Sequence, residues 1–540
     1  MANLTPMMRQ YLEMKDKYPG MILFFRLGDF YEMFFDDAKL VSRELELTLT
    51  GKSCGMEERA PMCGVPFHSA ETYINRLIEK GYKVAICEQM EDPATAKGLV
   101  KRDVTRVVTP GTVIEQSMLD ERQNNYLLSV CLDSKRAGLS FIDVSTGEFF
   151  VYEIDNAHDR LRDEIVRISP KEIISNQPLP ANASQRPFDL RDAGTYQHSK
   201  AKNALLAHFN VQSLDTFGIE HLKLAVRAAG ALMKYLQETQ KNALEHITAI
   251  AEYHDKRYMM LDYTARRNLE LTETMRSRQK CGSLLGILDY TCTAMGGRML
   301  RSFIEQPMAV KEDIDKRLDA ISELYQADIV VDQLREELKD VYDIERLLSK
   351  VSYHSINAKD CVALNTSLSK IPAIRNALEQ IEPTGLLRDL LSDLSPLDDV
   401  TDLLERAIDP EPPFLMSDGG YIKAGYNPQL DKLRNASKNG ETWIAELEAK
   451  ERELTQIKNL RIKYNKVFGY YIEVTKSNYD QVPFRYTRKQ TLANAERYII
   501  HELKDFENKI LGAHEKIVSL EYHLFTDLIE TIKQRIVSMQ

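Results

Sequence analysis

The alternation of apolar and polar residues over the first part of the chain predicts a small α/β domain, residues 1–115. Thr5 and Pro6 have the cap-then-proline order that begins a helix. An apolar run of strand length then leads through Leu27-Gly28-Asp29 into residues with helical spacing. We therefore expect a strand, a turn and a helix around Gly28. The predicted elements are a helix from 6 to the stop at 18–20, helices at 31–45 and 70–80, and strands at 21–26, 82–88 and 106–114, with a polar loop before the helix at 70.

A second α/β domain, residues 116–242, is predicted to follow. Its extended runs are separated by turn residues, such as Ser145-Thr146-Gly147. That pattern is typical of an antiparallel meander. A stretch rich in Pro, Asn and Ser, residues 176–187, is expected to form an exposed loop. The predicted elements are strands at 126–132, 139–144, 148–154 and 172–175 and a helix at 159–168.

Beyond Ala243 the apolar positions recur with helical period, and strand signals vanish except in one interval. Asn427-Pro428 begins a long helix, after which two alternating runs, 460–464 and 470–474, predict a β-hairpin. Helical spacing resumes at Thr491. The fold class is therefore a multidomain combination of α/β and all-α parts. Its helical portion is divided into a first core part at 243–415, an inserted segment with a β tip at 416–505, and a returning helix at 506–540.

Length and composition indicate a folded protein of several domains. A chain of 540 residues exceeds what one hydrophobic core usually organises, which suggests about three to five domains. Apolar residues make up 43% and charged residues 28%, as in folded multidomain proteins. No window approaches the ~20 apolar residues of a membrane helix, and the first residues lack the apolar stretch of a signal peptide. We expect a cytoplasmic protein that does not enter a membrane.

Signals for catalysis or metal binding are weak. The sequence contains no phosphate loop of the GxxxxGKS or GxxxxGKT type, no HExxH and no GxSxG motif. The seven cysteines and eleven histidines have no spacing that would hold zinc. We therefore expect this chain to have no catalytic residue, no metal site and no cofactor.

The first candidate site is Phe30 with Glu32, beside the turn at Gly28. An aromatic side chain projecting from such a corner can enter a base step as an apolar wedge, and a mispaired step resists opening less. Glu32 is unusual for a DNA surface because phosphate repels its charge, but a carboxylate can accept a hydrogen bond from a base edge. In the alternative interpretation, Phe30 belongs to the aromatic core and Glu32 is simply solvated.

The second candidate is the basic tip, Thr455 to Gln490, where eight basic residues stand against two acidic ones in a chain whose net charge is -10. Basic and small polar side chains are typical of contacts with phosphate oxygens, which carry no sequence information. A solvated charged surface is the alternative. The DNA-backbone candidates here are Asn465, Lys466, Lys476, Ser477 and Asn478, and a smaller cluster in the first domain adds Lys97 and Arg102.

Several motifs of this sequence resemble those of the MutS family of mismatch-recognition proteins. The likeness covers essentially all 540 residues. In the first domain it rests on FFRLGDFYEMFFDDA, APMCGVPFHSAETYINRLIEKGYKVAICEQMEDP and VVTPGTV. Further along it rests on LDYTARRNLEL, TAMGGRMLRSFIEQP, GYNPQLDKLR, NKVFGYYIEVTKSN and QTLANAERYIIHELKDFENKI.

The resemblance implies that Phe30 stacks on a mispaired or unpaired base and that Glu32 hydrogen-bonds to it. It also implies a mismatch-binding domain, a connector with a ribonuclease-H-like sheet, helical levers, and an inserted clamp that grips the backbone of double-stranded DNA. Members of the family form homodimers and dock the partner protein MutL through the connector. Their ATP and Mg²⁺ are held in a further C-terminal ATPase domain.

Because the sequence stops at Gln540 within a helical pattern, we expect a fragment that lacks this ATPase domain and has no ATPase activity of its own. Dimerisation and tight mismatch binding by such a fragment are open. The competing hypothesis is a helical scaffold of the same family that joins partners without recognising mismatches.

Overall fold

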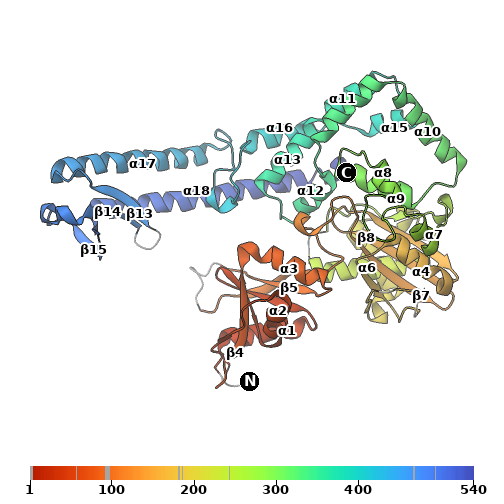
Figure 1. Ribbon diagram of the computed structural model, residues 1–540, viewed down its shortest axis with the longest axis horizontal. Helices are drawn as coiled ribbons and strands as arrows, with labels where there is room; N and C mark the ends of the chain where they lie inside the picture. Colours follow the sequence, from red (N-terminus) through yellow and green to blue (C-terminus); the bar gives the residue numbers. More distant parts are fainter. Residues whose placement is uncertain are drawn as a thin grey trace. The chain divides into compact units, whose positions relative to one another are not determined.

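The computed structural model (Figure 1) describes residues 4–55, 57–91, 98–180, 183–184, 186–241, 244–465, 469–492 and 494–540, without the side chains of 255, 436–442 and 505–513. The chain divides into two units. The first comprises Met1–Ser355, Lys370–Pro396 and Ile536–Gln540, and the second comprises Ile356–Ser369 and Leu397–Arg535. No helix among the described residues is long and apolar enough to cross a membrane.

The first unit begins with an N-terminal sheet domain. Its six strands have the order β3-β4-β2-β1-β5-β6, in which only β1 and β5 are parallel neighbours. One face packs against α1, and the other packs against α2 and α3. The elements are α1 (Pro6–Lys17), β1 (Ile22–Leu27), β2 (Phe30–Phe34), α2 (Phe35–Leu45), β3 (Thr50–Lys52), β4 (Ala60–Pro66), α3 (Ala70–Glu79), β5 (Val84–Gln89) and β6 (Arg102–Val108).

The chain around Gly28 is a β-hairpin, so the predicted passage from strand to helix at Tyr31 is wrong. Leu27 pairs with Phe30 across the two-residue turn. Gly28 has φ +59°, at the turn position where a type II′ hairpin requires a positive φ. Tyr31 has helical spacing to Phe34 but also alternates with Met33, and the pairing of β2 on both sides decides for the strand. The helix begins only at Phe35.

Two further differences concern the ends of this sheet. The residues predicted as a polar loop before α3 contain the paired strands β3 and β4. The strand predicted at 106–114 is β6, which begins earlier and ends at Val108. The chain turns there because Thr109 and the backbone N–H of Gly111 bind the Glu172 carboxylate, and Pro110 has no N–H with which to continue the ladder.

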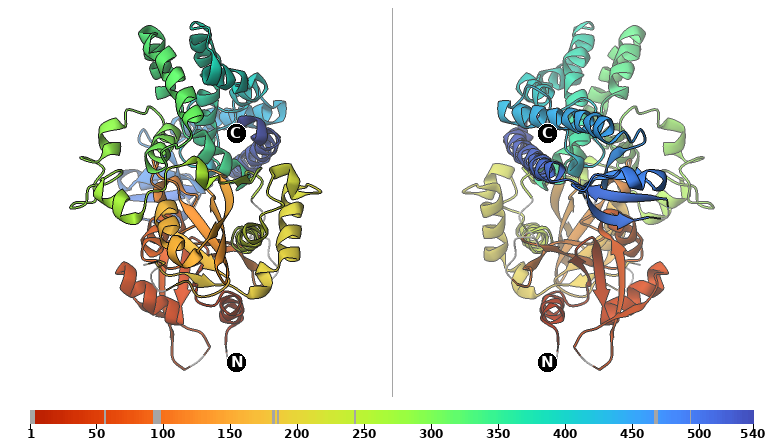
Figure 2. Two further views of the ribbon diagram at one scale, coloured as in Figure 1. Left: turned by 90° about the vertical axis from the view of Figure 1, so that its right-hand side faces the viewer. Right: turned by 90° about the vertical axis from the view of Figure 1, so that its left-hand side faces the viewer.

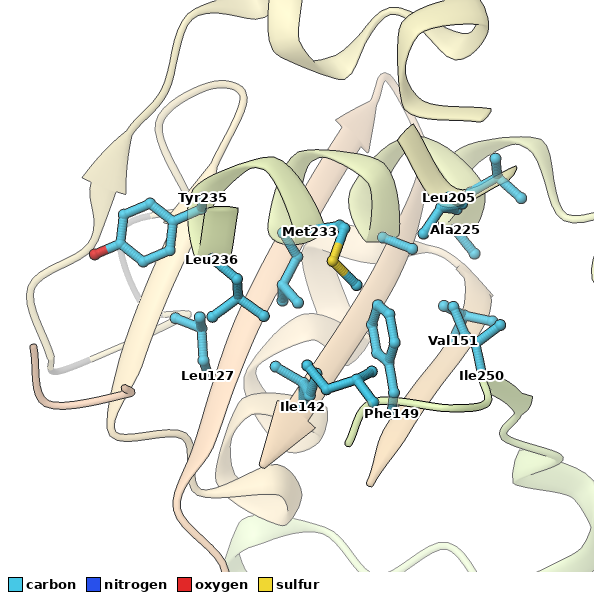
Figure 3. Packing of buried hydrophobic residues seen from close by; sticks show 14 of the residues in the cluster. Leu127, Ile142, Phe149, Val151, Leu205, Ala225, Met233, Tyr235, Leu236 and Ile250 are labelled. Carbon is cyan, nitrogen blue, oxygen red and sulfur yellow. The ribbon is translucent and has the colours of Figure 1, made fainter. Parts of the chain in front are cut away.

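A second sheet domain follows in the same unit and confirms the predicted meander. Strands β7, β8 and β9 are antiparallel, and β10 lies parallel to β7. Figure 3 shows α6 lying over the sheet with Met233 directed toward Ile142 and Phe149. The elements are β7 (Tyr126–Asp133), β8 (Arg136–Asp143), β9 (Phe149–Asp155), α4 (Ala157–Ile168), β10 (Glu172–Ser175), β11 (Asp189–Leu190), α5 (His198–Phe209) and α6 (Lys223–Gln240).

The remainder of the first unit is helical except for one short strand beside β9, which the helical pattern did not predict. Arg298 on α9 forms an ion pair with Asp343, the residue before α12. The elements are β12 (Ala251–Glu252), α7 (Tyr263–Asn268), α8 (Leu284–Leu288), α9 (Ala294–Glu305), α10 (Lys311–Tyr325), α11 (Asp328–Lys339), α12 (Ile344–Ser352), α14 (Ile371–Glu379), α15 (Gly385–Asp393) and α19 (Ile536–Met539).

The second unit consists of helices and a four-stranded sheet of order β13-β14-β16-β15. Helices α17 and α18 run side by side, as both views in Figure 2 show, and α17 alone is about 42 Å long. The elements are α13 (Ala358–Ser369), α16 (Asp398–Ala407), α17 (Pro428–Thr455), β13 (Arg461–Asn465), β14 (Gly469–Thr475), β15 (Thr487–Thr491), β16 (Ala495–Ile499) and α18 (His501–Lys533). We call α17, α18 and this sheet the arm.

Within the arm the predicted antiparallel pairing is confirmed, since Asn465 pairs with Gly469 and Arg461 with Glu473. The predicted return to helix at Thr491 is wrong. Residues Ala495–Ile499 form β16 between β14 and β15, and helix begins at His501. Tyr498 and Ile500 alternate as on a strand, and both pack into the core beneath the sheet.

The buried ion pair of Arg298 is expected to stabilise the helical part of the first unit. Its guanidinium binds both oxygens of Asp343 at 2.7 and 2.8 Å, and Nη1 also donates to the Glu121 carbonyl at 2.9 Å. The Arg298 and Asp343 side chains are only 4% and 8% exposed. Asp343 additionally accepts from the Arg346 N–H at the start of α12. Loss of the Arg298 cation therefore leaves the buried Asp343 carboxylate with only the more distant Arg346 guanidinium, 3.8 Å away.

We predict that Arg298→Met lowers the local unfolding free energy of α9 and α12 by about 3–5 kcal/mol, measured by native-state hydrogen exchange. Lys311→Met is the control. It removes an ion pair with Asp315 whose lysine side chain is 81% exposed, so it should change the same free energies by less than about 1 kcal/mol. Equal effects of the two variants would contradict a stabilising role for the buried pair.

Candidate nucleic-acid interface

Phe30 is an exposed aromatic residue in a domain whose other strand phenylalanines are buried. Phe24, Phe25 and Phe34 are 0–1% exposed, whereas Phe30 is 46% exposed. It is the first residue of β2 and pairs with Leu27 on one side and Pro66 on the other. The interpretation that placed Phe30 in the aromatic core is therefore wrong. The ring is available to a ligand.

The strand conformation puts Phe30 and Glu32 on one face of the sheet. Side chains alternate along a strand, so residues two apart point the same way and lie about 7 Å apart. Phe34 shares this face and packs against Tyr11 of α1, with the ring centroids 5.0 Å apart. On this face of β2, α1 thus covers the end at Phe34 and leaves the end at Phe30 exposed. Glu32 lies between them.

Glu32 is held by an ion pair with Lys52. The Lys52 Nζ lies 2.6 Å from Oε2 of Glu32, and the two side chains are 34% and 16% exposed. Oε1 of Glu32 has no hydrogen bond to any residue that the structure describes. The interpretation of Glu32 as a simply solvated carboxylate is therefore wrong. Spacing along the sequence does not connect Glu32 with Lys52, because they lie on strands β2 and β3 with β4 between them.

Gly64 gives the Glu32 side chain its space. The two residues are register partners between β2 and β4. A Cβ atom at position 64 would lie 3.5 Å from Cγ of Glu32 and 3.3 Å from the Tyr31 carbonyl oxygen. A side chain at this position would therefore be tight against the Tyr31 carbonyl oxygen and would make ordinary contact with the Glu32 methylenes, which now lie above bare backbone.

On the opposite face Arg26 braces the turn. Its guanidinium carbon lies 3.8 Å from the centre of the Phe67 ring and 5.4 Å from that of Tyr31. Its Nε donates to the Gly28 carbonyl, and the Tyr31 hydroxyl donates to Glu88. Burial raises the pKa of that hydroxyl, which therefore stays protonated. These contacts fix the turn before Phe30 from the face of the sheet opposite Phe30.

Arg102 does not fit its predicted role at the DNA backbone. It is 6% exposed, and its Nε donates to the Arg26 carbonyl at 2.8 Å. Its Nη1 donates to Gln10 and to the Val100 carbonyl, both at 3.0 Å. Basic residues that are close in the sequence suggest a surface patch, but Arg102 is buried and connects α1 to the sheet through Gln10 and the Arg26 carbonyl. Its predicted neighbour Lys97 lies outside the described residues.

The arm carries the basic tip, and its cations fall into two groups. Lys463, Arg485 and Arg488 form ion pairs with Glu473, Glu451 and Glu496. Four other exposed cations have no ion pair with any described residue: Lys458, Arg461, Lys476 and Lys489. Lys466 lies outside the described residues. The surplus positive charge of the tip therefore rests on the second group.

The small polar candidates lie next to Lys476. Ser477 is exposed, and Asn478 donates from Nδ2 to Thr475 Oγ1 at 3.3 Å. Both belong to the six-residue 3-10 segment Lys476–Gln481 that follows β14. Asn465 lies at the end of β13, opposite Gly469. Within the described ranges no group of His, Cys, Asp and Glu is arranged to hold a metal ion.

Three family models, for MutS domains I, II and III, match successive parts of the chain and together cover nearly all of it. MutS domain I matches residues 5–117, MutS domain II matches 125–248, and MutS domain III matches 264–540. The third match alone covers just over half of the sequence. The chain belongs to the MutS family. In this MutS-family chain Phe30 and Glu32 lie within the domain I match, and the basic tip lies within the domain III match.

Curated relatives of this MutS-family chain carry the name DNA mismatch repair protein MutS. The protein from Alkaliphilus metalliredigens is 51% identical over 552 residues, which cover 100% of this chain and 63% of the relative. That from Ruminiclostridium cellulolyticum is 52% identical, covering 99% and 62%. That from Lachnoclostridium phytofermentans is 50% identical, covering 100% and 59%. The chain thus spans about three fifths of the length of these relatives.

Proposed function

We propose that this MutS-family chain binds double-stranded DNA at mispaired or unpaired bases, with Phe30 as the wedge and Glu32 as the hydrogen-bond acceptor. The observation that carries the proposal is an exposed phenylalanine at the edge of an otherwise buried aromatic core, on the same face as a carboxylate. A ring that enters a base step loses less energy where pairing is already faulty. Selection then depends on deformability of the duplex and not on its base sequence.

The proposal extends to the arm, which acts as a clamp on the DNA backbone. Its four exposed cations without ion pairs are available to phosphate oxygens, and release of counterions from DNA would favour their binding. Helix α17 belongs to the proposed clamp, residues 416–505. The helices of 243–415 and the returning helix of 506–540 serve as the levers. Three antiparallel strands followed by parallel ones support a ribonuclease-H-like connector in the second sheet domain. For the longer proteins we propose homodimers that dock MutL.

The wedge is tested with Phe30→Ala. We expect the ratio of affinities for mismatched and fully paired duplex to fall by about five- to a hundredfold, because stacking on one base contributes about 1–3 kcal/mol. Fluorescence anisotropy with the two duplexes measures the ratio. Tyr325→Ala removes an aromatic side chain that is 82% exposed on α10 and should leave the ratio unchanged. An unchanged ratio for Phe30→Ala would refute the wedge and favour the scaffold hypothesis.

The clamp is tested by neutralising Arg461 and Lys476 to glutamine. Affinity for paired and mismatched duplex should fall by the same factor, because phosphate contacts carry no information about pairing. The slope of log affinity against log salt should become shallower by about 0.9 for each phosphate interaction that the substitutions remove. Lys316→Gln, which removes one positive charge at an exposed position on α10, should leave the slope as it is. A selective loss of mismatch binding would instead place the tip in recognition.

A further inference from the structure

We propose that Lys52 is a positioning residue that makes Glu32 usable beside DNA, by neutralising the charge of Glu32 through one carboxylate oxygen and leaving the other oxygen to accept a hydrogen bond from a base. The inference rests on the proposed function of Phe30 and Glu32. It assigns a role to a side chain on β3, which belongs to neither the wedge nor the basic tip.

The difficulty that Lys52 resolves is electrostatic. A carboxylate brought next to a duplex is repelled by the phosphates and loses hydration as the interface closes. Both effects act on mismatched and paired DNA alike, so they oppose binding without adding selectivity. A cation 2.6 Å from Oε2 makes the pair neutral overall. The group can then approach the base edge without that repulsion.

The geometry leaves the acceptor intact. Lys52 contacts Oε2, whereas Oε1 has no hydrogen bond to the described part of the chain. A carboxylate has lone pairs on both oxygens, so the ion pair and a base N–H can be bound at the same time. The pair need not break when DNA binds. Lys52 also restricts the rotation of Glu32, which would otherwise be ordered only on binding.

The sheet is arranged so that Lys52 can reach Glu32. Lys52 ends the three-residue edge strand β3 and pairs with Ala60 on β4, so its side chain must cross β4 to meet β2. Gly64, the register partner of Glu32 on β4, has no side chain that could stand beside the carboxylate. The Lys52 ammonium also lies 5.7 Å from the centre of the Phe34 ring, on the face that Phe34 and Glu32 share. These contacts orient a long and flexible side chain.

A double-mutant cycle tests the pairing, with mismatched and paired duplexes titrated by fluorescence anisotropy. Lys52→Met should weaken mismatch binding about tenfold in the chain with Glu32, because the uncompensated carboxylate then faces the phosphates. In the Glu32→Gln chain, which keeps an acceptor but no charge, the same substitution should weaken binding by less than about twofold. Lys52→Arg retains the cation and should restore most of the affinity.

The matched control is Lys80→Met. Lys80 and Glu44 form an ion pair of similar exposure in the same domain, at 2.9 Å, and its loss should leave mismatch binding within about twofold. Thermal unfolding of each variant verifies that the domain is folded. Equal losses from Lys52→Met with and without the Glu32→Gln substitution would overturn the inference, since Lys52 would then be an ordinary phosphate contact. Failure of Lys52→Arg to restore binding would also count against it.

The outcome is separable from that of the proposed function. If Phe30→Ala does not change the ratio of mismatched to paired affinity, the wedge itself fails. If Phe30→Ala lowers the ratio while the cycle between Lys52 and Glu32 is additive, the wedge stands and only the role of Lys52 is refuted.

Discussion

The candidate site depends on the two-residue turn between β1 and β2. With Gly28 at a positive φ, Leu27 pairs directly with Phe30, and this register decides which face every β2 side chain occupies. A slip of one residue would exchange the buried Tyr31 and Met33 with Phe30 and Glu32. The cost of exposing two large apolar side chains enforces the register. The same burial that stabilises the domain therefore projects the phenylalanine.

The sequence predicted the important residues here but not their secondary structure. An aromatic residue and an acid beside a glycine turn suit a wedge, and the resemblance to the MutS family implies the same two residues, Phe30 and Glu32. The helical spacing at Tyr31, Phe34 and Phe35 was misleading, since short apolar runs satisfy both periods. Pairing with β1 and β4 decided the matter, and such non-local hydrogen bonds leave no trace in local spacing. Strands β7 to β10 of the second sheet domain were predicted well because each is a short and largely buried apolar run. Helices α5 and α6 of the same domain were not predicted.

Charge was the property that the sequence predicted least well. Arg102 lies near other basic residues along the chain, yet its donors are used inside the domain. Lys52 was overlooked in a segment assigned to a loop, although it is the counterion of Glu32. In the arm, too, the seven described basic residues of the tip separate into paired and unpaired ones only when the partner glutamates are known. A count of charged residues gives the net charge of a segment. The role of a single cation depends on which side chains lie near it in the folded protein.

These two uses of charge correspond to two different requirements of mismatch recognition. Affinity for any duplex needs cations that are not already neutralised, since each exchanges small counterions for a phosphate. Selectivity needs the reverse at the base edge, where an excess of either sign would act on paired and mispaired DNA equally. A neutral ion pair beside an apolar ring meets this second requirement, because its net field is small and its remaining acceptor is directional. Binding strength and discrimination can then be adjusted separately, through the arm and through the N-terminal sheet domain.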